Sequence, residues 1–370
     1  MKTYRIILTP TSSIDGFPAS DTLFGAMCWG IKAIHGEGKL CKKLERFDKD
    51  DPPFVLSSSF PVLEANNGRT YFYPTPCMPG PGMSRMKCIA SECSPSDLAF
   101  KLALTRAVRN WKRFRKARFV SHELMGRLLA EGSLVDAFRD YHSGIGQPGG
   151  AVTLVSDDLL MTGDEYMAIF GDVKPPKLIG TAITQKNMID RLQGSTGGAG
   201  ELYYTSDTRL RGASEGPVMK LHFLLKTSDV DFLMPVFRWL ADTGIGGNRS
   251  SGRNQFLVSE PEDAQVPEAT PGDVFFTLSR CLPKPEGEEP LIYRLLPQRH
   301  RAESSHFRDS DIWKRKVIYF QEGSCFRHSQ SSEYYGRIEE VKRIGHRSIR
   351  QNGLAFPIFG TAVQKHEAGA

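Results

Sequence analysis

A glycine-rich stretch at residues 242–256, DTGIGGNRSSGRNQF, constrains the fold more than any other part of the chain. An amphipathic pattern at 232–240 precedes it and an alternating pattern at 255–259 follows it, so the stretch connects a helix to a strand. Glycines permit positive φ and let a ligand approach the backbone closely. Exposed N–H groups beside Arg249 and Arg253 therefore predict an anion-binding loop. The alternative is a connection that only lets a helix turn into a strand.

Two kinds of nucleotide-binding loop do not fit this stretch. Gly247 and Gly252 have Walker spacing, but Arg253 and Asn254 follow them, so the lysine and the magnesium-binding hydroxyl are both missing. Walker and dinucleotide loops also run from a strand to a helix, whereas this loop runs from a helix to a strand. A mononucleotide or dinucleotide site is therefore not expected here.

The order of regular patterns up to residue 260 predicts the fold class. The patterns are, in order, a strand at 3–8, a helix at 22–34 capped by Asp21, strands at 177–184 and 218–225, a helix from residue 231 and a strand at 254–258. This is the order of ferredoxin-like and RRM domains, in which two helices back an antiparallel sheet. We therefore expect an α+β protein whose first domain, residues 1–260, is RRM-like.

Two segments interrupt this expected domain. Residues 36–100 look irregular, with many prolines and glycines, and we expect a large loop-rich insertion at about 36–175 with a surface role. At about 184–205, two short alternating arms flank a glycine-rich tip and predict a projecting hairpin. There, Asn187 and Arg191 could contact phosphates or base edges, and Met188 could wedge between bases. A surface hairpin without a ligand is the alternative.

Residues 100–114 form a helical pattern with one strongly basic side. Apolar residues, from Phe100 to Phe114, occupy the other side. The basic side and its continuation carry no acidic residue, and consist of Lys101, Arg106, Arg109, Lys112, Arg113, Arg115, Lys116 and Arg118. Such density suits a nucleic-acid backbone or an acidic protein surface. A solvated helix face is the simpler alternative.

The part of the chain after this domain is expected to form a second unit. Residues 261–272 are rich in Pro, Glu and Asp and predict a linker. Short alternating runs with recurring basic residues follow, and they predict a second, degenerate α+β domain at 273–370. A chain of 370 residues is long enough for two domains with separate cores.

Composition bounds the chemistry and the compartment. Seven cysteines without a C-x-x-C pair indicate a reducing compartment, and Cys77, Cys88 and Cys93 lack a fourth ligand at zinc-finger spacing. We therefore expect no metal and no cofactor. The sequence shows no charged-then-apolar leader and no apolar run near 18 residues, so a soluble, cytoplasmic protein without membrane contact is expected.

Several motifs together resemble a known family. The loop at 244–252, placed after the second helix of an RRM-like domain, resembles the glycine-rich signature of the RAMP proteins of CRISPR systems. The stretches DTLFGAMCW at 21–29, NMIDR at 187–191, and YFQEGSCF at 319–326 with GLAF at 353–356 resemble one subunit. It is the crRNA 5′-handle-binding RAMP subunit of the type III-A CRISPR (Csm) effector complex. The similarity covers most of the chain in order, and is loose at 36–175.

This resemblance implies two RRM-like RAMP domains and a non-catalytic role in antiviral defence. Members of the family cap the foot of the effector ribonucleoprotein and hold the repeat-derived 5′ handle of the crRNA. They contact the large polymerase-like signature subunit and a backbone RAMP subunit. The RNA-binding residues that the resemblance implies are Gly244, Gly246, Gly247, Asn248, Arg249, Ser250, Ser251, Gly252 and Arg253, then Lys186, Asn187, Met188 and Arg191 of the hairpin, and Asp21. Residues expected at a partner or at the RNA backbone are Arg106, Arg109, Lys112, Arg113 and Arg347.

Three other functions compete with this reading. His35 lies where related RAMP ribonucleases that process guide RNA place a general base, although a histidine in the last turn of a helix is also stabilised by the helix dipole. Asp190 in the hairpin could support metal-dependent cleavage of target RNA, although its neighbour Arg191 indicates an ion pair or a turn. A generic RRM-like RNA binder is the third, but no K/R-G-F/Y-G/A-F-V-x-F/Y strand is visible.

Overall fold

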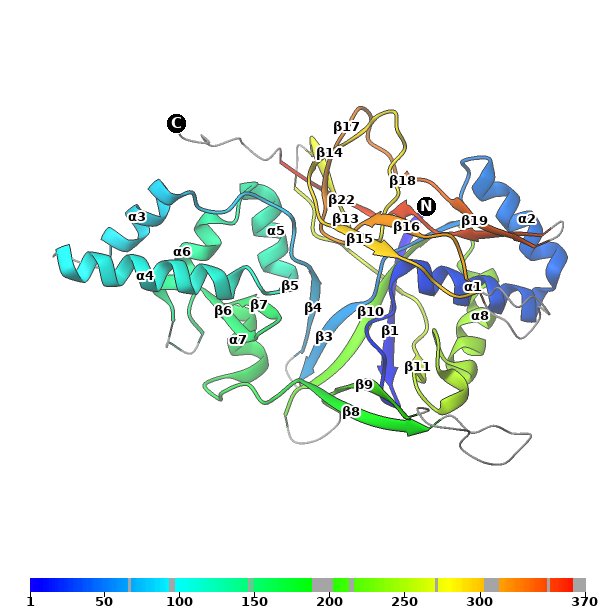
Figure 1. Ribbon diagram of the computed structural model, residues 1–370, viewed down its shortest axis with the longest axis horizontal. Coiled ribbons are helices and arrows are strands. Elements are labelled where there is room, and N and C mark those ends of the chain that lie inside the picture. The colour runs from blue at the N-terminus through cyan, green and yellow to red at the C-terminus, as the bar shows by residue number, and fades with distance from the viewer. Residues whose placement is uncertain are drawn as a thin grey trace.

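The computed structural model describes residues 1–361 except 66–67, 93–96, 146, 148, 188–201, 213–215, 270–271, 303–312 and 345–346 (Figure 1). Its helices are α1 (Ser20–His35), α2 (Glu37–Asp48), α3 (Met83–Ser91), α4 (Asp97–Phe114), α5 (His122–Glu131), α6 (Val135–Ser143), α7 (Gly163–Phe170) and α8 (Val230–Thr243). A 3₁₀ turn spans Arg249–Ser251. None of the helices in the described residues is long and apolar enough to cross a membrane.

The strands fall into two groups, one that ends at residue 263 and one that begins at residue 274. The first group is β1 (Lys2–Pro10), β2 (Phe54–Leu56), β3 (Phe60–Ala65), β4 (Gly68–Pro74), β5 (Phe119–Ser121), β6 (Val152–Ser156), β7 (Leu159–Thr162), β8 (Ile179–Asn187), β9 (Leu202–Leu210), β10 (Val218–Thr227), β11 (Phe256–Val258) and β12 (Glu262–Asp263). The second group is β13 (Val274–Thr277), β14 (Glu288–Ile292), β15 (Leu295–Gln298), β16 (Val317–Phe320), β17 (Cys325–His328), β18 (Tyr335–Gly336), β19 (Glu339–Ile344), β20 (Arg347–Gln351), β21 (Leu354–Ala355) and β22 (Pro357–Gly360).

The main sheet has the strand order β11-β1-β10-β3-β4-β5-β7-β6. The central pair, β1 and β10, is antiparallel from Lys2↔Thr227 to Leu8↔Leu221; β1 is buried over its middle, residues 5–8, and β10 at nearly every position. Helices α1 and α8 lie against each other beside this pair (Figure 1). Gly30 permits the approach, because a Cβ there would lie 2.6 Å from Cγ1 of Val236. The protein is therefore a mixed α/β structure built on one long sheet.

The structure corrects the expected strand assignment. The place beside β10 belongs to β3, which lies in a segment predicted to be irregular, whereas residues 177–184 contribute to β8. The many prolines made this segment look irregular, whereas Pro61 and Pro74 stand inside or at the end of short strands. Residues 36–175 are likewise not loop-rich, since α2–α7 and β2–β7 fall within them.

Helices α3–α7 with strands β5–β7 extend the sheet on one side and form a helical module (Figure 1, left). Its core is aromatic. The ring of Phe138 meets Trp111 edge-on at 5.1 Å between centroids and Phe114 at 5.7 Å, and Tyr141 packs beside Phe114 at 5.5 Å. The buried stripe of α4 that the sequence predicted is confirmed at Ala107 and Phe114, so the basic side of α4 faces outward.

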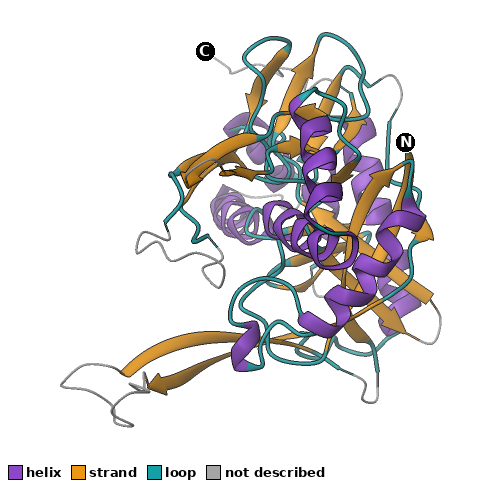
Figure 2. Cartoon of the chain, turned by 90° about the vertical axis from the view of Figure 1, so that its right-hand side faces the viewer, coloured by secondary structure: helices purple, strands orange, loops and turns teal. Residues whose placement is uncertain are grey.

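Strands β8 and β9 pair antiparallel from Ile179↔Leu210 to Asn187↔Leu202 and extend away from the body of the protein (Figure 2). The base of this hairpin is joined to the N-terminal segment by the bridge Ile14↔Thr208. The residues between the two strands, 188–201, are outside the described part of the chain.

The strands after residue 272 include the antiparallel sheet β14-β17-β13-β22 and several two-stranded sheets. The described residues of this part contain strands and no helix, so a second α+β domain is not confirmed. This part packs directly on the first, because the N–H of Ser58 donates to Leu278 O and that of Cys77 to Gly323 O. Within the expected linker, β12 pairs with β1.

Buried His222 of β10 makes stability depend on pH. Its Nε2–H donates to Phe72 O at 3.0 Å, and burial, followed by the charge of Arg5, lowers the pKa of His222 to about 3. The unfolded chain binds this proton near pH 6.5, so the stabilisation is complete above that pH and is lost progressively toward pH 3. We expect the free energy of unfolding to fall by about 2 kcal/mol from pH 7 to pH 5 through this group.

Urea unfolding at pH 7 and pH 5 tests this expectation. The His222→Gln variant should lack that part of the pH dependence, because glutamine keeps a donor for the Phe72 carbonyl without titrating. An equal pH dependence in both proteins would contradict the assignment.

Candidate RNA interface

The glycine-rich loop is a compact turn that closes α8. Helix α8 ends at Gly244, whose N–H donates to Leu240 O at 2.9 Å and whose φ is 77°. A Cβ at this glycine would lie 2.6 Å from Asn254 O, so only glycine fits. Positive φ also occurs at Gly246, Asn248 and Gly252. These residues are therefore required by the shape of the loop, whatever the loop binds.

Asp15 holds the loop in place. One carboxylate oxygen of Asp15 accepts from Nδ2 of Asn248 and from Nδ2 of Asn254, both at 2.9 Å. The same amide group of Asn254 donates to Gly247 O at 2.7 Å, while its Oδ1 accepts from the N–H of Asp15. The loop is thus tied to the segment between β1 and α1, and its outer residues Gly247, Asn248, Ser250, Ser251 and Gly252 are exposed.

Arg253 does not face a ligand as the sequence predicted. It is 4% exposed, and its guanidinium pairs with Asp15 at 2.8 Å and with Asp207 of β9, while Nη2 also donates to Ser206 O at 2.7 Å. Because its guanidinium contacts two carboxylates and one carbonyl, Arg253 joins the loop to the base of the hairpin. Its predicted RNA contact therefore has no support in this placement.

Arg249 lies at a cavity of about 420 Å³ between the loop and the first helix. Gly246 and Gly247 line the same cavity with Gly25 and Trp29 of α1. The opposite wall comes from the second part of the chain and contributes three basic residues, His300, Arg301 and Lys314. Basic groups on two walls make this cavity attractive to a polyanion.

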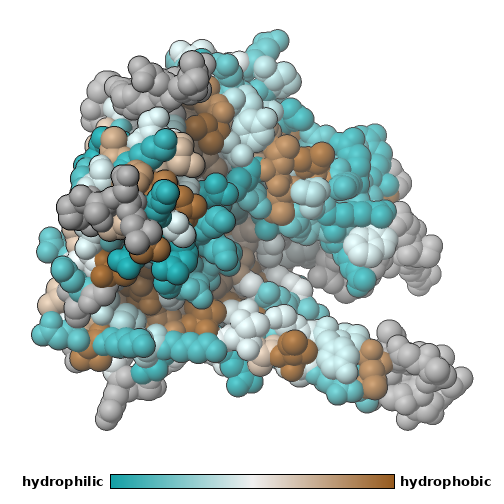
Figure 3. Space-filling view, turned by 60° about the vertical axis from the view of Figure 1, so that its left-hand side comes forward, coloured by the Kyte–Doolittle hydropathy of each residue, from teal (hydrophilic) through white to brown (hydrophobic). Residues whose placement is uncertain are grey.

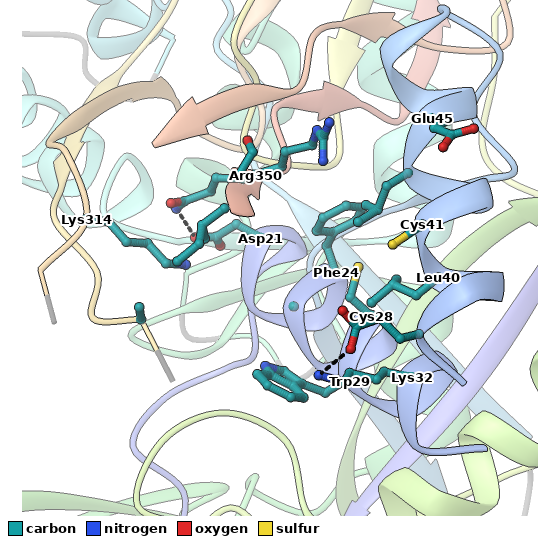
Figure 4. Close-up of a pocket in the computed structure, with 17 residues that line it drawn as sticks. Asp21, Phe24, Cys28, Trp29, Lys32, Leu40, Cys41, Glu45, Lys314 and Arg350 are labelled. Carbon is teal, nitrogen blue, oxygen red and sulfur yellow. Dashed lines mark hydrogen bonds and ion pairs between the residues drawn. The ribbon is translucent and has the colours of Figure 1, made fainter. Parts of the chain in front are cut away.

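A second cavity, of about 490 Å³, adjoins the first along α1 (Figure 4). Both cavities are lined by Gly25, Trp29 and Lys314. Figure 4 shows the Trp29 ring at the edge of α1, with Lys314 approaching from the opposite segment. Burial lowers the pKa of Lys314, which is the effect expected where a cation is held without enough water. Trp29 offers an aromatic face on which a base can stack.

Asp21 has a structural role here and is not the helix cap that the sequence predicted. The N-cap of α1 is Ala19, and Asp21 stands in the first turn. Its buried carboxylate meets Arg280 at 3.0 Å and His300 at 2.9 Å. Burial alone would raise the pKa of Asp21, but the bond from His300 and the charge of Arg280 outweigh it, so the pKa is lowered. Asp21 therefore positions His300 at the first cavity and does not itself suit a phosphate.

The hairpin residues are only partly described. Lys186 and Asn187 lie at the outer end of β8, whereas Met188, Asp190 and Arg191 fall outside the described residues. The arms bear exposed apolar and aromatic side chains, which Figure 3 shows as brown and pale atoms along the projection. They are Ile183, Leu202, Tyr203 and Tyr204. Exposed aromatics on a projecting arm suit stacking, and they were missed because both tyrosines were interpreted only as strand residues.

The other predicted residues lie apart from the loop. Arg106, Arg109, Lys112 and Arg113 are exposed on α4 in the helical module, and Arg347 is in β20, with its side chain outside the described part. His35 stacks on the ring of Phe232 at 4.0 Å between centroids and bonds to its carbonyl at 2.9 Å. Cys77 is buried and Cys88 exposed, and no group of metal-ligating residues occurs among those described.

Comparisons with known proteins agree with the resemblance that the motifs indicated. No family model matches the chain. The protein "CRISPR system Cms protein Csm4" of Thermococcus onnurineus (strain NA1) is 24% identical over 358 residues, covering 96% of each chain. A chain in the crystal structure of the Csm3–Csm4 subcomplex of the type III-A CRISPR-Cas interference complex has a TM-score of 0.56 and 17% identity, covering 94% of this chain and 98% of that one.

A chain in the Csm1–Csm4 cassette in complex with pppApA has a TM-score of 0.52 and 18% identity, covering 98% of this chain and 100% of that one. At such identities the solved structures show a shared fold. The sequence match to Csm4 extends over nearly the whole chain, including the segment 36–175 where the motifs were weak. The predicted resemblance is therefore confirmed as a similarity to Csm4 of a CRISPR system over nearly the whole chain.

Proposed function

We propose that this chain is a non-catalytic RNA-binding subunit of a type III-A CRISPR effector complex, where it holds the 5′ handle of the crRNA. The observation that carries the proposal is the basic cavity between the glycine-rich loop and α1. Arg249 lines it from the loop, Arg301 and Lys314 line it from the second part of the chain, and the carboxylate of Asp21 is already neutralised by its own partners. A single-stranded backbone with bases to stack fits a cationic groove with an aromatic wall.

The partners follow from the relatives. The similar solved chains come from Csm1–Csm4 and Csm3–Csm4 assemblies, so we propose that this chain bridges a large signature subunit and a backbone RAMP subunit. The expected domain organisation is part of the same proposal. The order β11-β1-β10-β3, with α1 following β1 and α8 following β10, supports a ferredoxin-like first domain at residues 1–260. The strands after residue 272 form the degenerate second domain.

A catalytic role is not proposed for His35. Its ring is stacked on Phe232 and bonded to the carbonyl of the same residue, which accounts for its position without a substrate. The His35→Ala variant should therefore leave precursor-RNA cleavage in the assembled complex unchanged. Loss of cleavage in this variant would restore the ribonuclease alternative.

The handle contact is tested with Arg249→Ala. We expect this variant to bind a guide RNA carrying the 5′ handle more weakly by about 1–3 kcal/mol, with a shallower salt dependence, because a charge-assisted contact to phosphate is lost. Arg238→Ala is the matched control, since this exposed arginine of α8 pairs at the surface with Glu260 among the described residues. Binding by titration should distinguish the two variants.

The same measurement with an RNA that lacks the handle completes the test. A handle-holding subunit should prefer the handle RNA, and Arg249→Ala should reduce this preference. Equal affinity of the unmodified protein for both RNAs would favour a generic RNA binder. An unchanged salt slope in Arg249→Ala would exclude this arginine as a phosphate contact.

A further inference from the structure

The net positive charge of this protein comes from one segment, α4 and the residues just after it. Residues 101–118, on α4 and just after it, contain eight Lys and Arg and no Asp or Glu. The whole chain has 48 basic and 42 acidic residues, so without this segment it would have 40 basic against 42 acidic and a slightly negative charge. The net charge of +6 therefore comes from a segment that forms no part of the cavities beside the glycine-rich loop.

The arginines of α4 differ from those of the adjacent helices in their ion pairs. On α5, Arg127 pairs with Glu131 and Asp140, both at 2.7 Å, and on α6, Arg139 pairs with Asp136 at 3.0 Å. Within the described part of the chain, Arg106, Arg109 and Arg113 of α4 have no ion pair and are exposed. A face that was merely solvated would be expected to alternate charges as the adjacent helices do.

The cations also follow a line. Arg106, Arg109 and Arg113 are spaced by three or four residues on α4, so each stands about one turn, or roughly 5.4 Å, beyond the last on the same side. Lys116 follows in the turn after the helix. The line continues at Arg118, whose guanidinium lies 5.2 Å from the ring centre of Phe119. A row of single charges along an axis is complementary to an extended polyanion.

Further arginines lie near the end of this row of cations, after α4. Arg118 lines a cavity of about 280 Å³ together with Arg280 and Arg294 of the second part of the chain. Arg294 donates to Thr75 O at 3.0 Å and has no carboxylate partner among the described residues. Arg280 is the partner of Asp21, which lines both cavities beside the glycine-rich loop. The row of cations thus leads from the helical module toward the proposed handle site.

We propose that this cationic track, Arg106, Arg109, Arg113, Lys116 and Arg118 with Arg294, binds the backbone of a single-stranded RNA outside the handle. The outer face of α4 has few apolar anchors, since Leu102 is the one large apolar side chain that the described part of this helix strongly exposes. Protein interfaces depend on buried aromatic and aliphatic anchors, so this face suits a phosphate backbone better than an acidic protein.

The test uses the full chain and a 20-nucleotide oligouridine without any handle sequence, with binding followed by fluorescence anisotropy over a series of salt concentrations. The Arg106→Gln/Arg109→Gln/Arg113→Gln variant should lower the slope of log K against log[salt] by about 2, because each phosphate contact on a single strand contributes about 0.7. At about 0.1 M salt this corresponds to roughly a hundredfold weaker binding.

The matched control removes three charges from paired arginines, in Arg69→Gln/Arg127→Gln/Arg139→Gln. It should keep the slope of the unmodified protein. An unchanged slope in the α4 variant, or an equal loss in the control, would overturn the proposal. So would an α4 variant that binds oligouridine normally but no longer co-purifies with the other effector subunits, since the face would then dock protein.

This inference does not depend on the handle site. The probe contains no handle, and Arg249→Ala should reduce preference for the handle while keeping the oligouridine salt slope within about one unit of the unmodified value. A chain with no handle preference could still pass the α4 test, and a chain that fails the α4 test could still hold the handle. The two failures are therefore distinguishable.

Discussion

Replacing Arg253 by methionine is expected to lower the free energy of unfolding by about 3–5 kcal/mol, because removing one partner of a buried pair leaves a buried charge without compensation. Arg253 is 4% exposed, and the side chain of its partner Asp207 is 9% exposed. Asp15, the other carboxylate partner, is partly solvated, so losing its ion pair accounts for the smaller part of the lost free energy. Urea unfolding of the variant measures the effect.

A second substitution separates charge from packing. In Arg253→Met/Asp207→Leu both members of the buried pair are apolar, and at least half of the loss should be recovered, since well-packed apolar replacements of ion pairs are often neutral. Arg238→Met is the exposed control and should cost less than about 1 kcal/mol. A loss below about 1 kcal/mol in Arg253→Met would show that the pair does not fasten the loop to the hairpin.

This prediction carries a functional consequence. Arg253 joins the glycine-rich loop, the segment before α1 and the strand β9, so its loss should loosen the loop that presents Arg249. Handle binding by folded Arg253→Met should then fall as well, although Arg253 does not reach the cavity. The double variant should restore stability more than handle binding, because the bond to the hairpin strand is not rebuilt.

Arg249 and Arg253 show what the sequence could and could not predict. Both lie in one glycine-rich loop, and the sequence predicts an anion contact for each of them equally. The difference comes from Asp15 and Asp207, which are remote in the chain and are brought together by the pairing of β9 with β8 and of Ile14 with Thr208. Local patterns report the type of a residue and its period, whereas burial depends on such distant contacts.

The same reasoning explains the other differences. The helices at 22–34 and 100–114 were predictable because an apolar stripe is a local signal, and α1 and α4 confirm them. Strand β3 was missed because Pro61 lies within it, and Lys314 was seen only as one of several recurring basic residues, since the sequence does not tell which of them lines a cavity. Trp29 could have been found, since it falls outside the apolar stripe of its own helix.

Replacing Phe138 by alanine should produce the other large effect, a loss of about 3–5 kcal/mol in the free energy of unfolding, because it opens a cavity among aromatic rings. Phe138 is fully buried and contacts Trp111 and Phe114, both on the inner side of α4. The same rings hold α4 in the orientation that exposes its arginines. Leu102→Ala on the exposed side of α4 is the control and should change stability by less than about 0.5 kcal/mol.

Phe138→Ala also distinguishes the helical module from the handle site. Far-UV circular dichroism and urea unfolding should show the loss, and the salt slope for oligouridine should become shallower as α4 loses its support. The preference for handle RNA should persist, because Arg249 and its cavity are built on α1, α8 and the second part of the chain. If handle preference and oligouridine binding fall together while the protein remains folded, the two RNA surfaces act as one.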